Sequence, residues 1–180
     1  MLNNKIDISV VDECCIDASQ LADCLSRVNQ NNFVFCGFLH GNLDSMLING
    51  GDRLISTEIN HYLLTNAFIY TFSCHCGAQL ADALIKNNAH TFWGYNAEAY
   101  VCNDYIDIFA KCSLAGYKYF IEGNAISRSE ELMVADINLA LDELYLKNAL
   151  VAACLMDNRN AMVVKGDKNL TIQDFQVAKL

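Results

Sequence analysis

The chain has 180 residues, a length at which one compact domain is expected rather than two. Hydrophobic residues make up 53% of it and charged residues only 18%, so it is too apolar and too lightly charged to be intrinsically disordered. Its 21 acidic and 12 basic residues give a formal net charge of −9, and such a surface repels a phosphate backbone. We therefore expect no nucleic-acid partner.

Nine cysteines are present, an odd number in a chain that is not small, and this argues against the disulfide framework of a secreted domain. The segment Met1–Asp7 has no cationic start followed by an apolar run, so we expect no secretory signal. The longest apolar stretches, Phe33–Leu39 and Ala67–Phe72, are far shorter than the roughly 20 residues that cross a bilayer. Free thiols in a reducing compartment fit this pattern, and we predict a cytoplasmic protein without a membrane span.

Short apolar runs alternate with longer amphipathic ones, which is the pattern of a mainly parallel sheet covered by helices. In chain order, the predicted elements are strand 6–11, helix 17–28, strand 33–39, strand 45–48, helix 56–64, strand 67–72, helix 77–86, strand 91–93, helix 104–121, helix 127–154 and strand 161–165. The strand at 33–39 is continuously apolar, as a strand buried on both faces should be. The sequence therefore predicts an α/β fold.

Local signals support several of these boundaries. Asn49–Asp52 contains Asn-Gly, which adopts positive φ easily and favours a small hairpin. Gly123 stops the helix at 104–121, and Ser127 with Glu130 predicts a capping box for the long helix that follows.

Two of the apolar strands end in residues that carry chemistry. The first is followed by His40 and Gly41, and the next core strand is followed by Ser73 and Cys74. Ligands of open α/β sheets bind beyond the carboxyl ends of the strands. If the two strands are neighbours, a histidine and a cysteine face one cleft, the arrangement of a thiolate nucleophile with an imidazole partner.

Backbone groups at the same strand ends suit an oxyanion. Gly41 has no Cβ, so its N–H can approach a substrate carbonyl, and the N–H of Cys74 supplies a second donor. A helix that begins at Gly77 would direct its positive end at the Cys74 sulfur, favour its anionic form and lower the pKa of the thiol. We expect Cys-His catalysis with an oxyanion hole formed by Gly41 and Cys74.

Three segments, FCGFLHG at 35–41, LINGGDRLISTE at 47–58 and YTFSCHCG at 70–77, resemble the caspase-like cysteine peptidases. Among these the chain looks most like the CHAT domains. The resemblance covers roughly 33–172 and includes LADALIKNNA at 80–89, TFWGY at 91–95 and VVKGDKNLTI at 163–172. It implies one caspase-like domain over 1–180, a three-layer sandwich in which helices flank a mainly parallel sheet. The region before Phe33 has room for one strand and one helix, so we expect an N-terminal part of the sheet to be absent or supplied by a partner.

The resemblance also implies a function, that of a thiol protease acting on protein or peptide substrates. By this resemblance Cys74 attacks the peptide carbonyl and His40 protonates the leaving amine, without a cofactor. The pocket for the first substrate residue is formed by the residue two before the cysteine and the stretch after the next strand. In this chain those positions are Phe72, Trp93, Tyr95 and Asn96. Glu98 or Asp52 would favour a basic side chain there, and the sequence leaves this choice open.

Two alternatives stay open. One is a catalytically silent domain of the same fold that binds a regulatory partner protein or forms a homo-oligomer. The other is a metal-binding module in which Cys74, His75 and Cys76 are joined by Cys14 and Cys15 or by Cys102. A structural zinc site normally needs a second pair of closely spaced ligands, and the sequence has no such pair, so we expect no metal.

Overall fold

The computed structural model describes residues 16–27, 31–48 and 51–175. The predicted strand at 6–11, Val28 and Cys14–Cys15 lie outside these ranges. The main sheet has four strands in the order β1 (Phe33–Phe38), β5 (Ala67–Phe72), β6 (Thr91–Tyr95) and β7 (Met162–Gly166). The first three strands run parallel and β7 pairs antiparallel with β6, so the sheet is mixed and mostly parallel.

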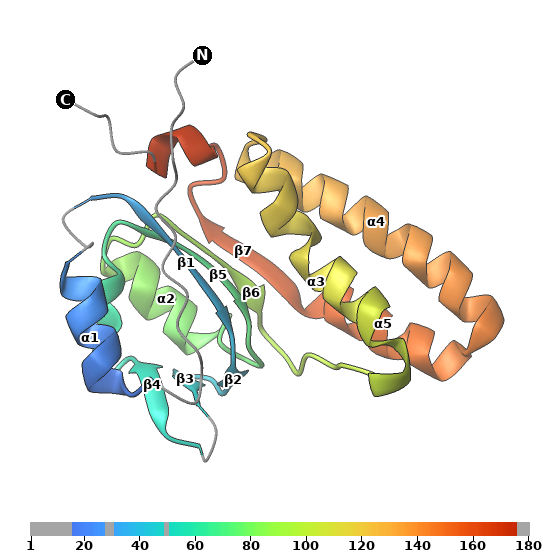
Figure 1. Cartoon of the computed structure of the whole chain (residues 1–180), viewed down its shortest axis with the longest axis horizontal. Coiled ribbons are helices and arrows are strands. Elements are labelled where there is room, and N and C mark those ends of the chain that lie inside the picture. The colour runs from blue at the N-terminus through green and yellow to red at the C-terminus, as the bar shows by residue number, and fades with distance from the viewer. Residues whose placement is uncertain (1–15, 28–30, 49–50, 176–180) are drawn as a thin grey trace.

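Helices cover both faces of this sheet and make three layers (Figure 1). On one face lie α1 (Ala18–Ser26) and α2 (Gln79–Lys86), and on the other lie α3 (Ile106–Ile121), α4 (Ile126–Lys147) and α5 (Ala149–Ala161). The predicted α/β class is confirmed. Among the described residues, no helix combines the length and the hydrophobicity needed to cross a membrane.

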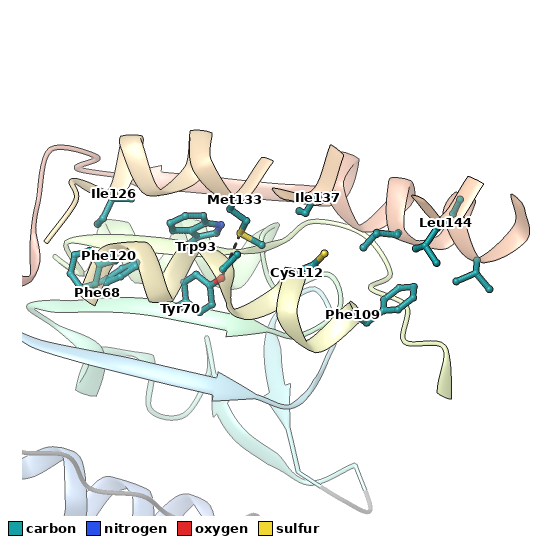
Figure 2. Close-up of a cluster of buried hydrophobic side chains, with 14 of the residues drawn as sticks. Phe68, Tyr70, Trp93, Phe109, Cys112, Phe120, Ile126, Met133, Ile137 and Leu144 are labelled. Carbon is teal, nitrogen blue, oxygen red and sulfur yellow. Dashed lines mark hydrogen bonds between the residues drawn. The ribbon is translucent and has the colours of Figure 1, made fainter. Parts of the chain in front are cut away.

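Strand alternation divides the core between the two faces. On β5, Ala67 and Ile69 pack with α1 and α2, while Phe68 and Tyr70 pack toward α3 and α4. Figure 2 shows the second cluster, where the Tyr70 hydroxyl donates to the Met133 sulfur at 3.6 Å and the Trp93 indole of β6 lies beside them. Its ring centroid is 5.1 Å from that of Tyr70, in an edge-to-face arrangement.

Helix α3 approaches Trp93 closely because position 116 is a glycine. A Cβ placed on Gly116 would lie 2.5 Å from an indole ring carbon and 2.9 Å from the sulfur of Met133. We expect Gly116→Ala to lower the free energy of unfolding by about 1–3 kcal/mol, since the core is filled and the helix must move. Urea unfolding measures the effect, and Lys111→Ala on the exposed face of α3 should change the value by less than about 0.5 kcal/mol.

A second, antiparallel sheet lies at the carboxyl end of β1. It contains β2 (His40–Gly41), β3 (Ser45–Leu47) and β4 (Arg53–Ser56). The hairpin predicted around Asn49–Asp52 is confirmed in its two strands, although 49–50 lie outside the described residues. The helix predicted at 56–64 is wrong, because β4 occupies its start and only a 3₁₀ turn, His61–Leu64, follows. The Asn60 amide stabilises this path, accepting from the N–H of Ser56 and donating to the carbonyl of Leu54.

Three other expectations also need correction. Among the described residues, strand β1 has one neighbour in the main sheet, and it is half-exposed instead of buried on both faces. The helix expected at 127–154 is two helices, because Asn148 is extended and its side chain caps α5. No capping box forms at Ser127, since α4 begins one residue earlier, after Ala125. In contrast, α1 does begin with a capping box, formed by Asp17 and Gln20.

Candidate active site

The strands that end in His40-Gly41 and Ser73-Cys74 are direct neighbours. Phe38 of β1 pairs with Phe72 of β5, and the N–H of Leu39 donates to the carbonyl of Phe72 at 3.2 Å. The two chain segments therefore leave the sheet side by side. This confirms the premise on which the sequence argument placed a histidine and a cysteine in one cleft.

Gly41 lies directly on the main chain that carries Cys74. A Cβ at Gly41 would be 2.5 Å from the Cys74 carbonyl oxygen, 2.6 Å from the Cys76 sulfur and 3.0 Å from the Cβ of Ser73. Only glycine permits this approach. His40 precedes this contact and is exposed, and Cys74 is half-buried, so the imidazole and the thiol belong to adjoining segments at one edge of the sheet.

A tight loop fixes this junction from the other side. After Gly41 the Asn42 side chain accepts from the N–H groups of Asp44 and Ser45, which closes the turn into β3. The carbonyl of Leu43 then accepts from the N–H of Leu80 at 2.9 Å, so the loop is tied to the first turn of α2. The junction is thus held by the β2–β3 loop as well as by the sheet.

Cys74 does not lie at a helix N-terminus, contrary to the expectation. Helix α2 begins at Gln79, and residues 74–78 form a turn in which His75 has a φ of 60°. The turn forms because the N–H of Gly77 donates to the carbonyl of Tyr95 at 2.7 Å, and a Cβ at Gly77 would strike Tyr95 and Val163. The helix dipole therefore acts five residues away from the sulfur, where its effect has fallen off.

The sulfur is instead held by a segment that the sequence analysis did not identify. The Ala99 N–H donates to the Cys74 Sγ at 3.3 Å, and the thiol donates to the Ala99 carbonyl at 3.7 Å. The next residue is clamped by α5, because the buried Asn158 side chain accepts from the N–H of Tyr100 and donates to its carbonyl, both at 2.7 Å. Asn158 lies among other polar residues of α5, so its sequence context does not distinguish it as the clamp.

Cys76, two residues after Cys74, is a contrasting thiol. It is fully buried, its Sγ donates to the carbonyl of Ser45 at 3.3 Å, and burial raises its pKa to about 12. Burial likewise raises the pKa of Cys112 to about 11. Both groups remain protonated thiols at neutral pH, so neither is prepared as a nucleophile.

These buried thiols predict a loss of stability in alkali. Above pH 9 the thiols of the unfolded chain ionise while Cys76 and Cys112 of the folded chain keep their protons. The stabilisation is complete below pH 9 and falls as pH rises, by at most about 1.4 kcal/mol per thiol and pH unit. Urea midpoints at pH 8, 9 and 10 test this. Cys76→Ala should flatten the decline, and an unchanged slope in that variant would contradict the assignment.

Two recesses border the Cys74 segment. A cavity of about 250 Å³ is lined by Phe38, Phe72, Val101, Ile106, Phe109, Ala110, Ser113 and Leu114. A more polar recess of about 450 Å³ is lined by His75, Asn96, Ala97, Glu98, Tyr100, Asp157, Asn160 and Ala161. The segment 97–101, which touches the Cys74 sulfur, contributes walls to both.

The four residues predicted to bind substrate are thus distributed over different surroundings. Phe72 lines the apolar cavity and Asn96 lines the polar recess. Tyr95 is buried and packs edge-to-face on Phe72, with ring centroids 5.0 Å apart, so it supports the cavity wall. Trp93 is 2% exposed and lies in the core against α3, away from both recesses.

Glu98 and Asp52 are the two acidic residues that could favour a basic substrate side chain. Glu98 lines the polar recess, and Asp52 is exposed near β4. Among the described residues, no group of three or more His, Cys, Asp or Glu gathers as a metal site would require.

Comparison of the chain with protein-family models, with curated proteins and with solved structures finds no match.

Proposed function

We propose that the chain is a caspase-like cysteine endopeptidase, with Cys74 as nucleophile and His40 as general acid and base. The observation that carries the proposal is the close approach of Gly41 to the main chain of Cys74. Because His40 precedes Gly41, this approach brings the His40 and Cys74 segments together at one end of the sheet. The sequence segments that resemble CHAT domains supply the reaction class, and the geometry supplies a consistent arrangement.

The mechanism has two halves. In the first, the Cys74 sulfur bonds to the peptide carbonyl carbon, the thiol proton passes to His40, and His40 delivers a proton to the leaving amine as the C–N bond breaks. In the second, water attacks the thioester carbon while His40 accepts one of its protons. The C–S bond then breaks, His40 returns this proton to the sulfur, and the carboxylic acid leaves and ionises to a carboxylate. The N–H groups of Gly41 and Cys74 are the proposed donors to the oxyanion in both halves.

The Ala99 contact fits this sequence of events. Its N–H and carbonyl hold the sulfur in one position before substrate arrives. These contacts orient the sulfur without removing its proton, so His40 remains the group that accepts the thiol proton and passes it to the leaving amine. Catalytic contacts of this kind often tighten only when substrate is bound.

Digestion of a proteome-derived peptide library tests the proposal. Protein treated with iodoacetamide is the background, and mass spectrometry identifies new peptide termini. We expect new termini that share a residue preference at the cleaved bond and are missing from the alkylated background. Identical peptide sets with native and alkylated protein would refute peptidase activity of the chain.

A second candidate, the silent interaction domain, is favoured by the free end of the α4–α5 hairpin. Leu146 and Leu150 are 88% and 81% exposed, and Leu139 and Tyr145 beside them are also exposed. Figure 1 shows this end of the helix pair extending beyond the sheet. Clustered exposed apolar side chains are typical of a protein interface. If this surface makes a homodimer, light scattering of the purified chain should give twice the monomer mass, and Leu146→Glu should restore the monomer.

A further inference from the structure

We propose that the apolar cavity beside Cys74 binds a large apolar side chain, that of the substrate residue on the acyl side of the cleaved bond. This rests on the proposed function and adds the substrate class. The residues that carry it are Phe38 and Phe72 on the sheet, Val101 on the segment that holds the sulfur, and Ala110 on α3.

The cavity is lined by the last residues of the two strands that lead to the proposed catalytic residues. Phe38 and Phe72 are paired across β1 and β5, and each stands two residues before its catalytic residue, His40 or Cys74. Their rings are nearly parallel, with centroids 6.4 Å apart. Each ring is the last residue of its strand, so the two rings form the end of the sheet from which the chain continues to His40 and to Cys74.

A second connection runs through the segment that follows β6. Val101 lines the cavity and stands two residues after Ala99, whose N–H contacts the Cys74 sulfur. The cavity is therefore bordered on two sides by chain that also touches or carries the nucleophile. An acyl group bonded to this sulfur has its side chain next to the cavity.

The walls select against polar side chains. Seven of the eight lining residues have apolar side chains, and the hydroxyl of the eighth, Ser113, already donates to the carbonyl of Ala110 at 3.1 Å. A charged or amide side chain would enter without a hydrogen-bond partner and would lose its hydration. A leucine, methionine or phenylalanine side chain loses nothing of that kind.

The rim of the cavity consists of large apolar side chains that are exposed to solvent. Phe38, Val101, Ile106 and Leu114 are 46%, 48%, 49% and 42% exposed. One such residue on a surface is ordinary, but four around one cavity form an apolar patch. An apolar side chain in this cavity of about 250 Å³ would displace water from apolar walls, which is favourable.

The competing site is the polar recess on the other side of 97–101. Glu98, Asp157 and two asparagines line it, so it would suit a lysine or arginine side chain. The Glu98 carboxylate, however, already accepts from the Tyr100 hydroxyl at 2.7 Å. The recess touches the Cys74 turn through His75, whose side chain is not part of the β5 wall. The apolar cavity has the stronger link to both catalytic residues.

Peptidyl aminocoumarin amides that differ only in the residue before the coumarin test the proposal, because the bond cleaved is fixed. We expect kcat/KM for leucine, methionine or phenylalanine to exceed that for alanine by about 10- to 100-fold. Lysine and aspartate should rank below alanine. Ala110→Phe fills the cavity and should cost at least about tenfold on the large apolar substrates, with alanine little changed. Lys111→Phe adds the same ring to the neighbouring exposed position and should leave the ranking as it is.

A binding measurement separates this proposal from the proposed function. In the Cys74→Ala chain, a leucine-ended peptide should shift the backbone amide NMR signals of Val101, Ala110 and Leu114, and Ala110→Phe should remove these shifts. Shifts without turnover by the native chain would support the pocket and refute the peptidase. Turnover that ranks lysine first, or an Ala110→Phe chain with native ranking, would overturn the pocket and leave the peptidase standing. Absence of the shifts would also overturn it.

Discussion

Cys74→Ala is expected to reduce kcat for peptide hydrolysis by at least about 10⁴-fold, because it removes the atom that forms the acyl-enzyme. Cys76, the thiol two residues further along the chain, cannot replace it. Cys76 is buried, donates to Ser45, and has its pKa raised to about 12 by burial. The rate is measured on a peptide cleaved by the native chain, at substrate concentrations that separate kcat from KM.

Cys24→Ala provides the control for this prediction. Cys24 is an exposed thiol on α1, outside the residues that line the two recesses. We expect the control to retain native kcat and the native unfolding midpoint. A Cys74→Ala chain that still cleaves within tenfold of the native rate would show that another group performs the chemistry.

His40→Ala is expected to lower kcat by about 10²- to 10⁴-fold, the usual contribution of general acid and base catalysis. KM should change little, since His40 acts on the thiol proton and the leaving amine and adds little to substrate binding. His40 lies on an exposed strand of two residues, so the fold should tolerate its removal.

His75 is the matched control for His40, because it adjoins Cys74 in the chain. Its φ of 60° makes asparagine the suitable replacement, since asparagine adopts this conformation readily. His75→Asn should cost less than about tenfold in kcat. The reverse result, a severe loss for His75→Asn with near-native rates for His40→Ala, would transfer the acid-base role to His75.

The parts of the fold that local patterns determine were predictable from sequence. The buried strand Ala67–Phe72 has the predicted bounds, and Leu21 and Leu25 form the buried face of α1. The adjacency of His40-Gly41 and Ser73-Cys74 was the condition on which the predicted site depended, and the pairing of β1 with β5 fulfils it. These features depend on hydrophobic periodicity, helix capping and strand ends, which short stretches of sequence determine.

Other features depend on contacts between distant segments. Among the described strands β1 lies at an edge of the main sheet, and its Cys36 and Phe38 are exposed despite their apolar sequence context. No local pattern indicates which strand lies at an edge. The start of α2 is set by the bond from Gly77 to Tyr95. The hold of Ala99 on the Cys74 sulfur requires Asn158 of α5 to clamp Tyr100, 58 residues away. A sequence reading cannot place these groups together.

Site-resolved alkylation tests the central claim, an activated Cys74-His40 pair, most directly. A brief, limiting dose of iodoacetamide at neutral pH is followed by mass spectrometry of every cysteine in the native and His40→Ala chains. The structure supplies internal references, since exposed Cys24 sets the rate of an ordinary thiol and buried Cys76 should stay unlabelled. We predict that Cys74 labels faster than Cys24 in the native chain and loses this advantage in His40→Ala. Labelling of Cys74 no faster than that of Cys24, or a rate that is the same without His40, would contradict the catalytic pair.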